Sequence, residues 1–584
     1  MSRRANVFAA SIIALTTALG AHAQISASGP LTQVDPWGVG WVGARNGGLG
    51  SDLWTATHAD DVELLYGSID VNVLTPAQEA LVRAIVLSGG RTPEGDTGNA
   101  MLQRIRLLRQ LGEERKAVDI HSRFPNKAWS EDPAKFDADL DLASGDNKRA
   151  CASAQTANSE DPYWQSVRAT CYALAGSLDA AQLSAEFAVS SGVEDPWLLS
   201  AVSAAVIADA DTRPTARFGN GVETALSIQG KLPPGNDTFV NLTPERALLI
   251  ADRPDAPDLL KMRALITAAR AGAISPDKAR RALVTPKPAD ATENTLRTPL
   301  ETAVDTVADP TTDVATKAKA LVDALSGSRN DIRAFKLHTK VLLPEIKAIP
   351  IKRETALFAP SYVEIALAAE DLELAKKWRA AMDNPFDKPP VPEPTQAQPA
   401  SGPQLLVPQQ PAPTPEPIVE ETSSNSVEIL PPVEHSEWDK VRLDSLIALS
   451  SDDASNAVIM DISRRLMSLP IEQQAGVVQI LSAFSGLGYP LSAEARTLLS
   501  DEANSRGFSH DASSSLSRIN ACLRAGAKGE AMMRALLLSF QEQGREGNPI
   551  VMADTLGAIS RAGLKDQARG LALEMIAPWG AVAS

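Results

Sequence analysis

The chain has 584 residues, of which 44% are hydrophobic, 22% charged and 4% aromatic, so it has enough apolar surface for several buried cores. Asp and Glu number 72 against 56 for Lys and Arg, which gives a net charge of −16. Because a carboxylate-rich surface repels phosphate, we expect no nucleic-acid partner. Three cysteines and six histidines exclude iron–sulfur proteins, zinc-finger arrays and disulfide-dense scaffolds.

Residues 1–23 predict a cleavable signal peptide. Two arginines precede an apolar run at 7–19, and Ala21-His22-Ala23 places small residues where signal peptidase cuts. The 13-residue run is shorter than the roughly 20 residues that a bilayer requires. We therefore expect cleavage after Ala23, no transmembrane segment after cleavage, and a periplasmic location.

Residues 24–50 are predicted to form a flexible arm rich in Gly and Ser. The run 38–43 matches the dinucleotide fingerprint G-x-G-x-x-G, but Asp35-Pro36 stands where a strand should end. We therefore expect no bound cofactor. Trp37 and Trp41 are candidate anchors, either for a partner or for the chain's own repeats.

Residues 384–435 are predicted to form a disordered, proline-rich linker, with 14 prolines between 385 and 432. The linker divides the chain into an N-terminal helical-repeat domain at 51–383 and a C-terminal helical domain at 436–584. Its length corresponds to roughly 150 Å if it is fully extended, enough to tether two separate binding modules.

The segments on both sides of this linker have helical patterns. Apolar residues recur at helical spacing, and runs of alternating strand-forming residues are nearly absent, so the predicted fold class is all-α. Capping residues followed by proline, which are typical of helix starts, recur at Thr75-Pro76, Asp161-Pro162, Asp195-Pro196, Thr243-Pro244 and Ser275-Pro276.

Two of the three cysteines flank a helix break at 159–162. If the flanking segments form an antiparallel helical hairpin, Cys151 and Cys171 lie at similar heights and can form a disulfide. The alternative is two buried free thiols. Cys522 is left over as a core residue in another part of the chain.

Two short runs recur at intervals typical of helix–turn–helix repeats. Asp161-Pro162-Tyr163-Trp164 returns 34 residues later as Asp195-Pro196-Trp197-Leu198, and Arg524-Ala525-Gly526 returns 37 residues later as Arg561-Ala562-Gly563. We expect Trp164 and Trp197 to be packing anchors between helices. Small residues such as Gly526 and Gly563 are expected to let paired helices approach closely.

These repeats resemble tetratricopeptide-like α-solenoid repeats, which implies a stack of helical hairpins. The chain also resembles a group of uncharacterised exported helical-repeat proteins of alphaproteobacteria, through the run 50–54, Cys151, and the run 161–164 that leads to Cys171. This resemblance implies a helical-repeat envelope protein without catalytic activity.

The sequence favours a binding role over catalysis. No two histidines have metal-ligand spacing, and no hydrolase or nucleotide-binding motif occurs in its proper context, so we expect neither a metal site nor catalytic residues. The predicted function is a non-enzymatic scaffold or adaptor that binds envelope proteins or extended peptides. The alternatives are a glycan-handling envelope enzyme, with glycan as the ligand, and an auxiliary subunit of surface-polysaccharide or appendage export.

Overall fold

The computed structural model of the chain describes residues 35–43, 48–123, 133–207, 213–235, 238–239, 242–284, 298–383, 434–451, 454–507, 510–541 and 547–577. Within these residues the regular elements are helices, and β structure is limited to an isolated bridge between His58 and Glu94. The prediction of an all-α helical-repeat fold is confirmed. The signal-peptide prediction lies outside the described residues. None of the described helices is both long and apolar enough to span a bilayer.

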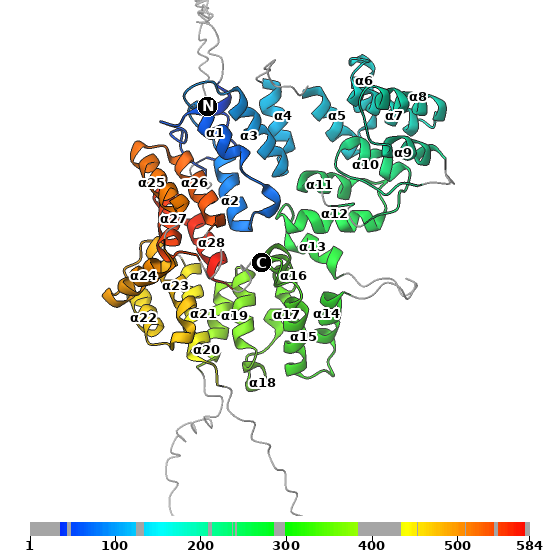
Figure 1. The fold of residues 1–584 in the computed structure, drawn as a ribbon. Helices are drawn as coiled ribbons and strands as arrows, with labels where there is room; N and C mark the ends of the chain where they lie inside the picture. The colour runs from blue at the N-terminus through cyan, green and yellow to red at the C-terminus, as the bar shows by residue number, and fades with distance from the viewer. Residues whose placement is uncertain are drawn as a thin grey trace, which may run out of the picture. The chain divides into compact units, whose positions relative to one another are not determined.

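The helices before the proline-rich segment are η1 (Pro36–Gly38), α1 (Ala59–Gly67), η3 (Val71–Val73), α2 (Pro76–Val86), α3 (Gly98–Gln110), α4 (Glu114–Arg123), α5 (Pro133–Ser144), α6 (Asn147–Thr156), α7 (Pro162–Leu174), α8 (Leu178–Ser190), α9 (Trp197–Val206), α10 (Gly221–Gln229), α11 (Pro244–Asp252), α12 (Asp258–Arg270), α13 (Pro276–Leu283), α14 (Pro299–Ala308), α15 (Val314–Ser326), α16 (Ile332–Val341), α17 (Leu343–Ala348), α18 (Arg353–Ala356), α19 (Ala359–Ala368) and α20 (Leu372–Ala381). The helices after it are α21 (Glu437–Ser450), α22 (Asn456–Met467), η4 (Ile471–Gln473), α23 (Gln474–Gly486), α24 (Ala493–Arg506), α25 (His510–Ala525), α26 (Lys528–Gln541), α27 (Pro549–Arg561) and α28 (Lys565–Ile576). Figure 1 shows their arrangement.

Four of the five predicted cap-plus-proline starts lie where they were expected. The helices α2, α7, α11 and α13 begin at the proline, and the side chain before it accepts a backbone N–H of the first turn. The fifth helix, α9, begins one residue later, at Trp197, and Asp195 Oδ1 accepts the Trp197 N–H at 2.9 Å. Short-range capping chemistry therefore determines where these helices begin.

The recurring glycines end helices rather than allow helices to approach closely. Gly526 joins α25 to α26 and Gly563 joins α27 to α28, with φ of +81° and +102°. A Cβ atom at either glycine would meet no atom within 4 Å. The expectation of close helix approach at these glycines is therefore corrected. They are needed because the left-handed backbone that ends each first helix favours glycine.

The first and last helices of the described chain share one hydrophobic core, to which α1–α3 and α25–α28 both contribute (Figure 1). Trp54, 2% exposed, lies at the centre of this contact, edge-on to Tyr66 with ring centroids 5.5 Å apart. The Gly529 N–H donates to Leu53 O at 2.8 Å. The run 50–54, on which the expected resemblance rests in part, therefore lies in the contact between the first and last helices of the described chain.

A second contact links the start of α2, the middle of the chain and α28. Glu574, 3% exposed, accepts the Ala77 N–H at 3.0 Å and pairs with Lys336 Nζ of α16 at 2.9 Å. Arg333 of the same helix α16 pairs with Glu79 of α2 at 2.6 Å. Two buried carboxylates, from α2 and α28, are therefore neutralised by partly exposed basic side chains of α16 at this junction.

The two helices that flank the proline-rich segment pack directly against each other. Arg379 of α20 pairs with Asp444 of α21 at 2.7 Å, and Lys440 pairs with Asp383 at 2.9 Å. The described residues from Pro36 onward belong to one compact unit. The described helices on either side of 384–433 are therefore in contact, whereas the sequence predicted that this segment tethers two separate modules. Its composition indicates that it lacks a core, but it does not indicate where its ends meet.

The described part of the predicted arm is packed against the chain itself. Trp37 is 1% exposed, and the buried Arg104 guanidinium donates to Val39 O at 2.7 Å and to Pro36 O at 3.3 Å. A Cβ atom on Gly40 would lie 2.2 Å from Gly89 N. Gly40, the middle glycine of the dinucleotide-like run, therefore serves close backbone packing. Residues 24–34 and 44–47 of the arm lie outside the described residues.

Candidate functional site

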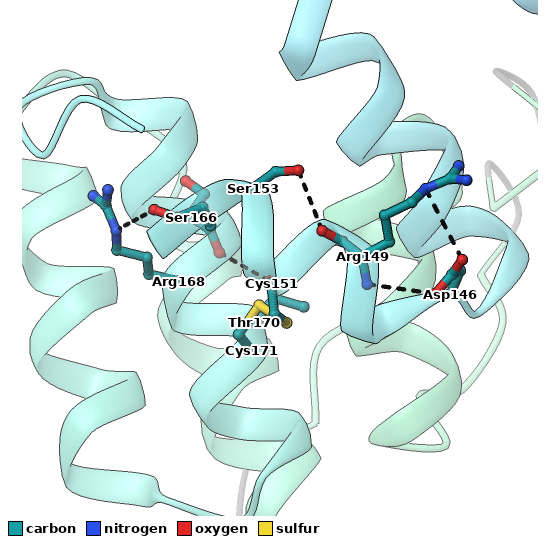
Figure 2. The surroundings of a disulfide bond; sticks show 9 residues. Asp146, Arg149, Cys151, Ser153, Ser166, Arg168, Thr170 and Cys171 are labelled. Carbon is teal, nitrogen blue, oxygen red and sulfur yellow. Dashed lines mark hydrogen bonds and ion pairs between the residues drawn. A yellow bond between two sulfur atoms is a disulfide. The ribbon is translucent and has the colours of Figure 1, made fainter. Parts of the chain in front are cut away.

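A disulfide crosslinks α6 and α7, the two helices on either side of the break at 159–162. Cys151 of α6 and Cys171 of α7 have their Sγ atoms 2.00 Å apart and their Cα atoms 5.8 Å apart, as predicted (Figure 2). Arg168 of α7 also donates to Ala154 O of α6 at 2.9 Å. Cys522 is buried in a different core cluster, and burial raises the pKa of its thiol to about 11. The bridge and this hydrogen bond fix α6 against α7.

Beside α7 lies a cavity of about 540 Å³, in the size range of roughly 300–1,000 Å³ that is usual for ligand pockets. The first turns of α7, α9 and α10 line it, together with residues of α3, α5 and α11. Its apolar wall is formed by Phe136, Pro162, Tyr163, Val193, Trp197, Leu198 and Val222. Both members of the 34-residue repeat, the runs 161–164 and 195–198, contribute to this wall.

Capping explains why the repeated runs place aromatic side chains at the cavity. Asp161 Oδ1 accepts the Tyr163 N–H at 2.9 Å, in the same way that Asp195 caps Trp197. The Trp197 indole N–H donates to Thr215 O at 2.7 Å. Trp164 is 2% exposed and does not line the cavity. Each repeat therefore directs one aromatic residue of its first turn to the cavity wall.

A buried ion-pair network lies at the edge of the cavity. Arg246 of α11 pairs with Asp139 of α5 at 2.7 Å and with Glu114 of α4 at 3.2 Å. Asp139 also accepts the Gly221 N–H at 2.6 Å, at the start of α10. Burial raises the pKa of Asp139, and Arg246 opposes this shift. The network joins four helices and orients the start of α10.

Each aromatic ring of the cavity is accompanied by a basic side chain. Arg109 lies 4.3 Å from the Phe136 ring, Lys135 lies 5.7 Å from the Tyr163 ring, and Arg217 lies 5.4 Å from the Trp197 ring. Lys135 also pairs with Asp161 at 2.5 Å, and Arg217 pairs with Asp195. These cations are thus held in place by the fold.

Among the carboxylates of the cavity wall, Glu223 is the one that forms no ion pair with a described residue. It lies in the first turn of α10, where its Oε2 accepts the Gly219 N–H at 2.8 Å and its own N–H donates to Asn220 Oδ1. Burial raises the pKa of this carboxyl group, and the hydrogen bond from Gly219 opposes the shift. Glu223 therefore presents a half-buried carboxylate to the cavity.

The hydroxyl groups of the cavity are engaged by the backbone. Tyr163 OH donates to Lys135 O at 2.7 Å, and Ser166 Oγ donates to Pro162 O at 2.9 Å. Burial raises the pKa of Tyr163. No group of three or more His, Cys, Asp or Glu side chains in the described ranges is arranged to hold a metal ion. Apolar walls with fixed charges can bind and orient a ligand.

Sequence reasoning identified only part of this site. It singled out Trp197, which lines the cavity, but it did not select Phe136 or Glu223. Phe136 carries no motif, and a glutamate three residues after Asn220 is typical of an ordinary helix start, so neither residue gave a signal. No protein-family model, curated protein or solved structure matches this chain.

Proposed function

We propose that the chain is a non-enzymatic binding protein of the bacterial envelope, a scaffold or adaptor whose helical repeats hold an extended protein or peptide partner. The observation that carries this proposal is that both Asp-Pro-aromatic runs of the 34-residue repeat line one cavity. In a helical-repeat protein, equivalent positions of successive repeats form a continuous binding surface.

The engaged polar groups support binding rather than catalysis. A nucleophile needs a free hydroxyl near a base, but Tyr163 and Ser166 donate to backbone carbonyls. Asp139 is neutralised by Arg246, and Asp195 by Arg217. These groups stabilise helix starts and inter-helix contacts, and they give the cavity a fixed shape.

Export to the periplasm is part of the proposal. The signal sequence at 1–23 and the Cys151–Cys171 bridge support it, because disulfides persist in oxidising compartments. Recovery of a mature chain that begins at Gln24 from the periplasmic fraction would test it.

The binding role is tested by filling the cavity. Val193 is a half-buried wall residue, so Val193→Trp adds bulk there, whereas Val189→Trp on α8 adds the same bulk outside the lining. Both variants and the unmodified chain are immobilised and exposed to envelope extract. We expect one or more proteins to be retained by the unmodified chain and by Val189→Trp, and lost with Val193→Trp. Identical retention by all three would contradict the proposal.

Glycan binding is the second candidate, because Phe136, Tyr163 and Trp197 give the cavity an aromatic wall. Incubation of the purified chain with murein distinguishes the two. Retention of intact glycan strands that Val193→Trp abolishes would favour glycan as the ligand, and new muropeptides would favour the glycan-handling enzyme.

A further inference from the structure

The ion pairs of the cavity leave one of its carboxylates without a partner. The charged residues that line it are three carboxylates, Asp139, Asp195 and Glu223, and three basic groups, Arg109, Lys135 and Arg246. Asp139 pairs with Arg246, and Asp195 pairs with Arg217. Among the described residues, Glu223 forms no ion pair.

The position of Glu223 makes this charge available to a ligand. It lies in the first turn of a nine-residue helix, so its backbone position is fixed, and the hydrogen bond from Gly219 orients one carboxylate oxygen. Arg217 and Arg246 attract this carboxylate from beyond ion-pair distance, but the loss of hydration on burial outweighs their effect and costs free energy. A cation that enters the cavity would recover this free energy.

The rest of the cavity wall can contact the apolar part of a ligand whose cationic group pairs with Glu223. Phe136, Tyr163 and Trp197 already have basic side chains close to their rings, so the like charges disfavour a further cation there. Val193, Leu198 and Val222 provide aliphatic surface. Lysine and arginine side chains combine these features, because their methylene stems pack on apolar surface while the charged end pairs with a carboxylate.

We infer that the cavity receives a lysine or arginine side chain of an extended peptide, and that Glu223 pairs with its cationic group. This inference rests on the proposed binding function and adds the chemical class of the ligand. It requires a partner with an accessible basic residue, which also complements the acidic net charge of the chain.

The probes for the test are three tripeptides, blocked by acetyl and amide groups, with the sequences Ala-Lys-Ala, Ala-Gln-Ala and Ala-Glu-Ala. Binding to the purified chain is measured by saturation-transfer NMR titration. We expect the lysine peptide to bind at least tenfold more tightly than the other two, since a charged hydrogen bond contributes roughly 1.5–3 kcal/mol. Glu223→Gln should remove this preference. Its side-chain oxygen can still accept the Gly219 N–H, so the variant should fold.

Glu186→Gln is the matched control, because Glu186 is exposed on α8 and does not line the cavity. It should bind the lysine peptide as the unmodified chain does. Equal binding of the three peptides, tighter binding of the glutamate peptide, an unchanged preference in Glu223→Gln, or no binding at all would overturn the inference. The proposed function would survive these results if Val193→Trp still abolished partner capture.

Discussion

The contact between the two ends of the chain makes a sharp prediction at Gly529, in the first turn of α26. A Cβ atom there would lie 2.7 Å from Trp54 Cζ3 and 2.8 Å from Leu53 O, whereas ordinary contacts lie at 3.4–4 Å. The Trp54 ring, 2% exposed, would have to move by more than half an ångström. Overpacking of this kind costs about 1–3 kcal/mol, and the gain in helix propensity offsets at most about 1 kcal/mol. We expect Gly529→Ala to lower the free energy of unfolding by about 1–2 kcal/mol.

Gly570→Ala on α28 is the matched control, because this glycine faces the same N-terminal segment with room for a methyl group. Its Cβ atom would lie 3.6 Å from Ala77 Cβ, an ordinary contact, so the substitution should gain up to about 1 kcal/mol. Urea unfolding followed by tryptophan fluorescence compares the two variants. A midpoint for Gly529→Ala equal to or above that of Gly570→Ala would refute the packing of α26 against Trp54.

Three further predictions concern the Cys151–Cys171 disulfide, the proline-rich segment and the cavity. Cys171→Ser should lower the free energy of unfolding by about 3 kcal/mol, as judged by urea unfolding with the oxidised chain as reference, and an unchanged midpoint would contradict it. Cleavage at a protease site inserted after Val407 should leave both fragments in one peak on size exclusion, because α20 and α21 stay paired; separate peaks would contradict it. Burial raises the pKa of Glu223, so the folded chain takes up this proton at a higher pH than the unfolded chain does. As the pH is lowered from the raised pKa to the ordinary Glu value, this group therefore increases the free energy of unfolding. Glu223→Gln should lack this rise in urea unfolding series at pH 7 and pH 5, and a parallel rise in both proteins would contradict it.

The features predicted correctly from the sequence depend on signals within a few residues. Thr75 and Gln78 form the capping box that their spacing indicates, and the pairing of Cys151 with Cys171 follows from two helices joined by one turn. Such features involve neighbours along the chain. They can therefore be derived without knowing which distant segments meet.

The features missed by sequence analysis depend on contacts between distant segments. Trp54 and Gly529 are separated by most of the chain, and no sequence pattern at either residue predicts their contact. The proline-rich segment illustrates the same limit, because its composition predicts the lack of a core but not the pairing of Arg379 with Asp444 across it. Glu223 resembles an ordinary helix-start residue until α5, α9 and α10 pack around it.

The contact between the chain ends and the cavity share one helix, α3. On one face of α3, Ile105 and Leu108 belong to the core that includes α26–α28. At the end of the same helix, Arg109 lies at the cavity and against the Phe136 ring. A solenoid with free ends can flex at each repeat, whereas contact between its ends restricts such motion. We therefore expect the packing of Trp54 on Gly529 to restrict motion of α3, which contributes Arg109 to the cavity wall. Under the proposed binding function, a fixed wall would reduce the ordering cost of binding.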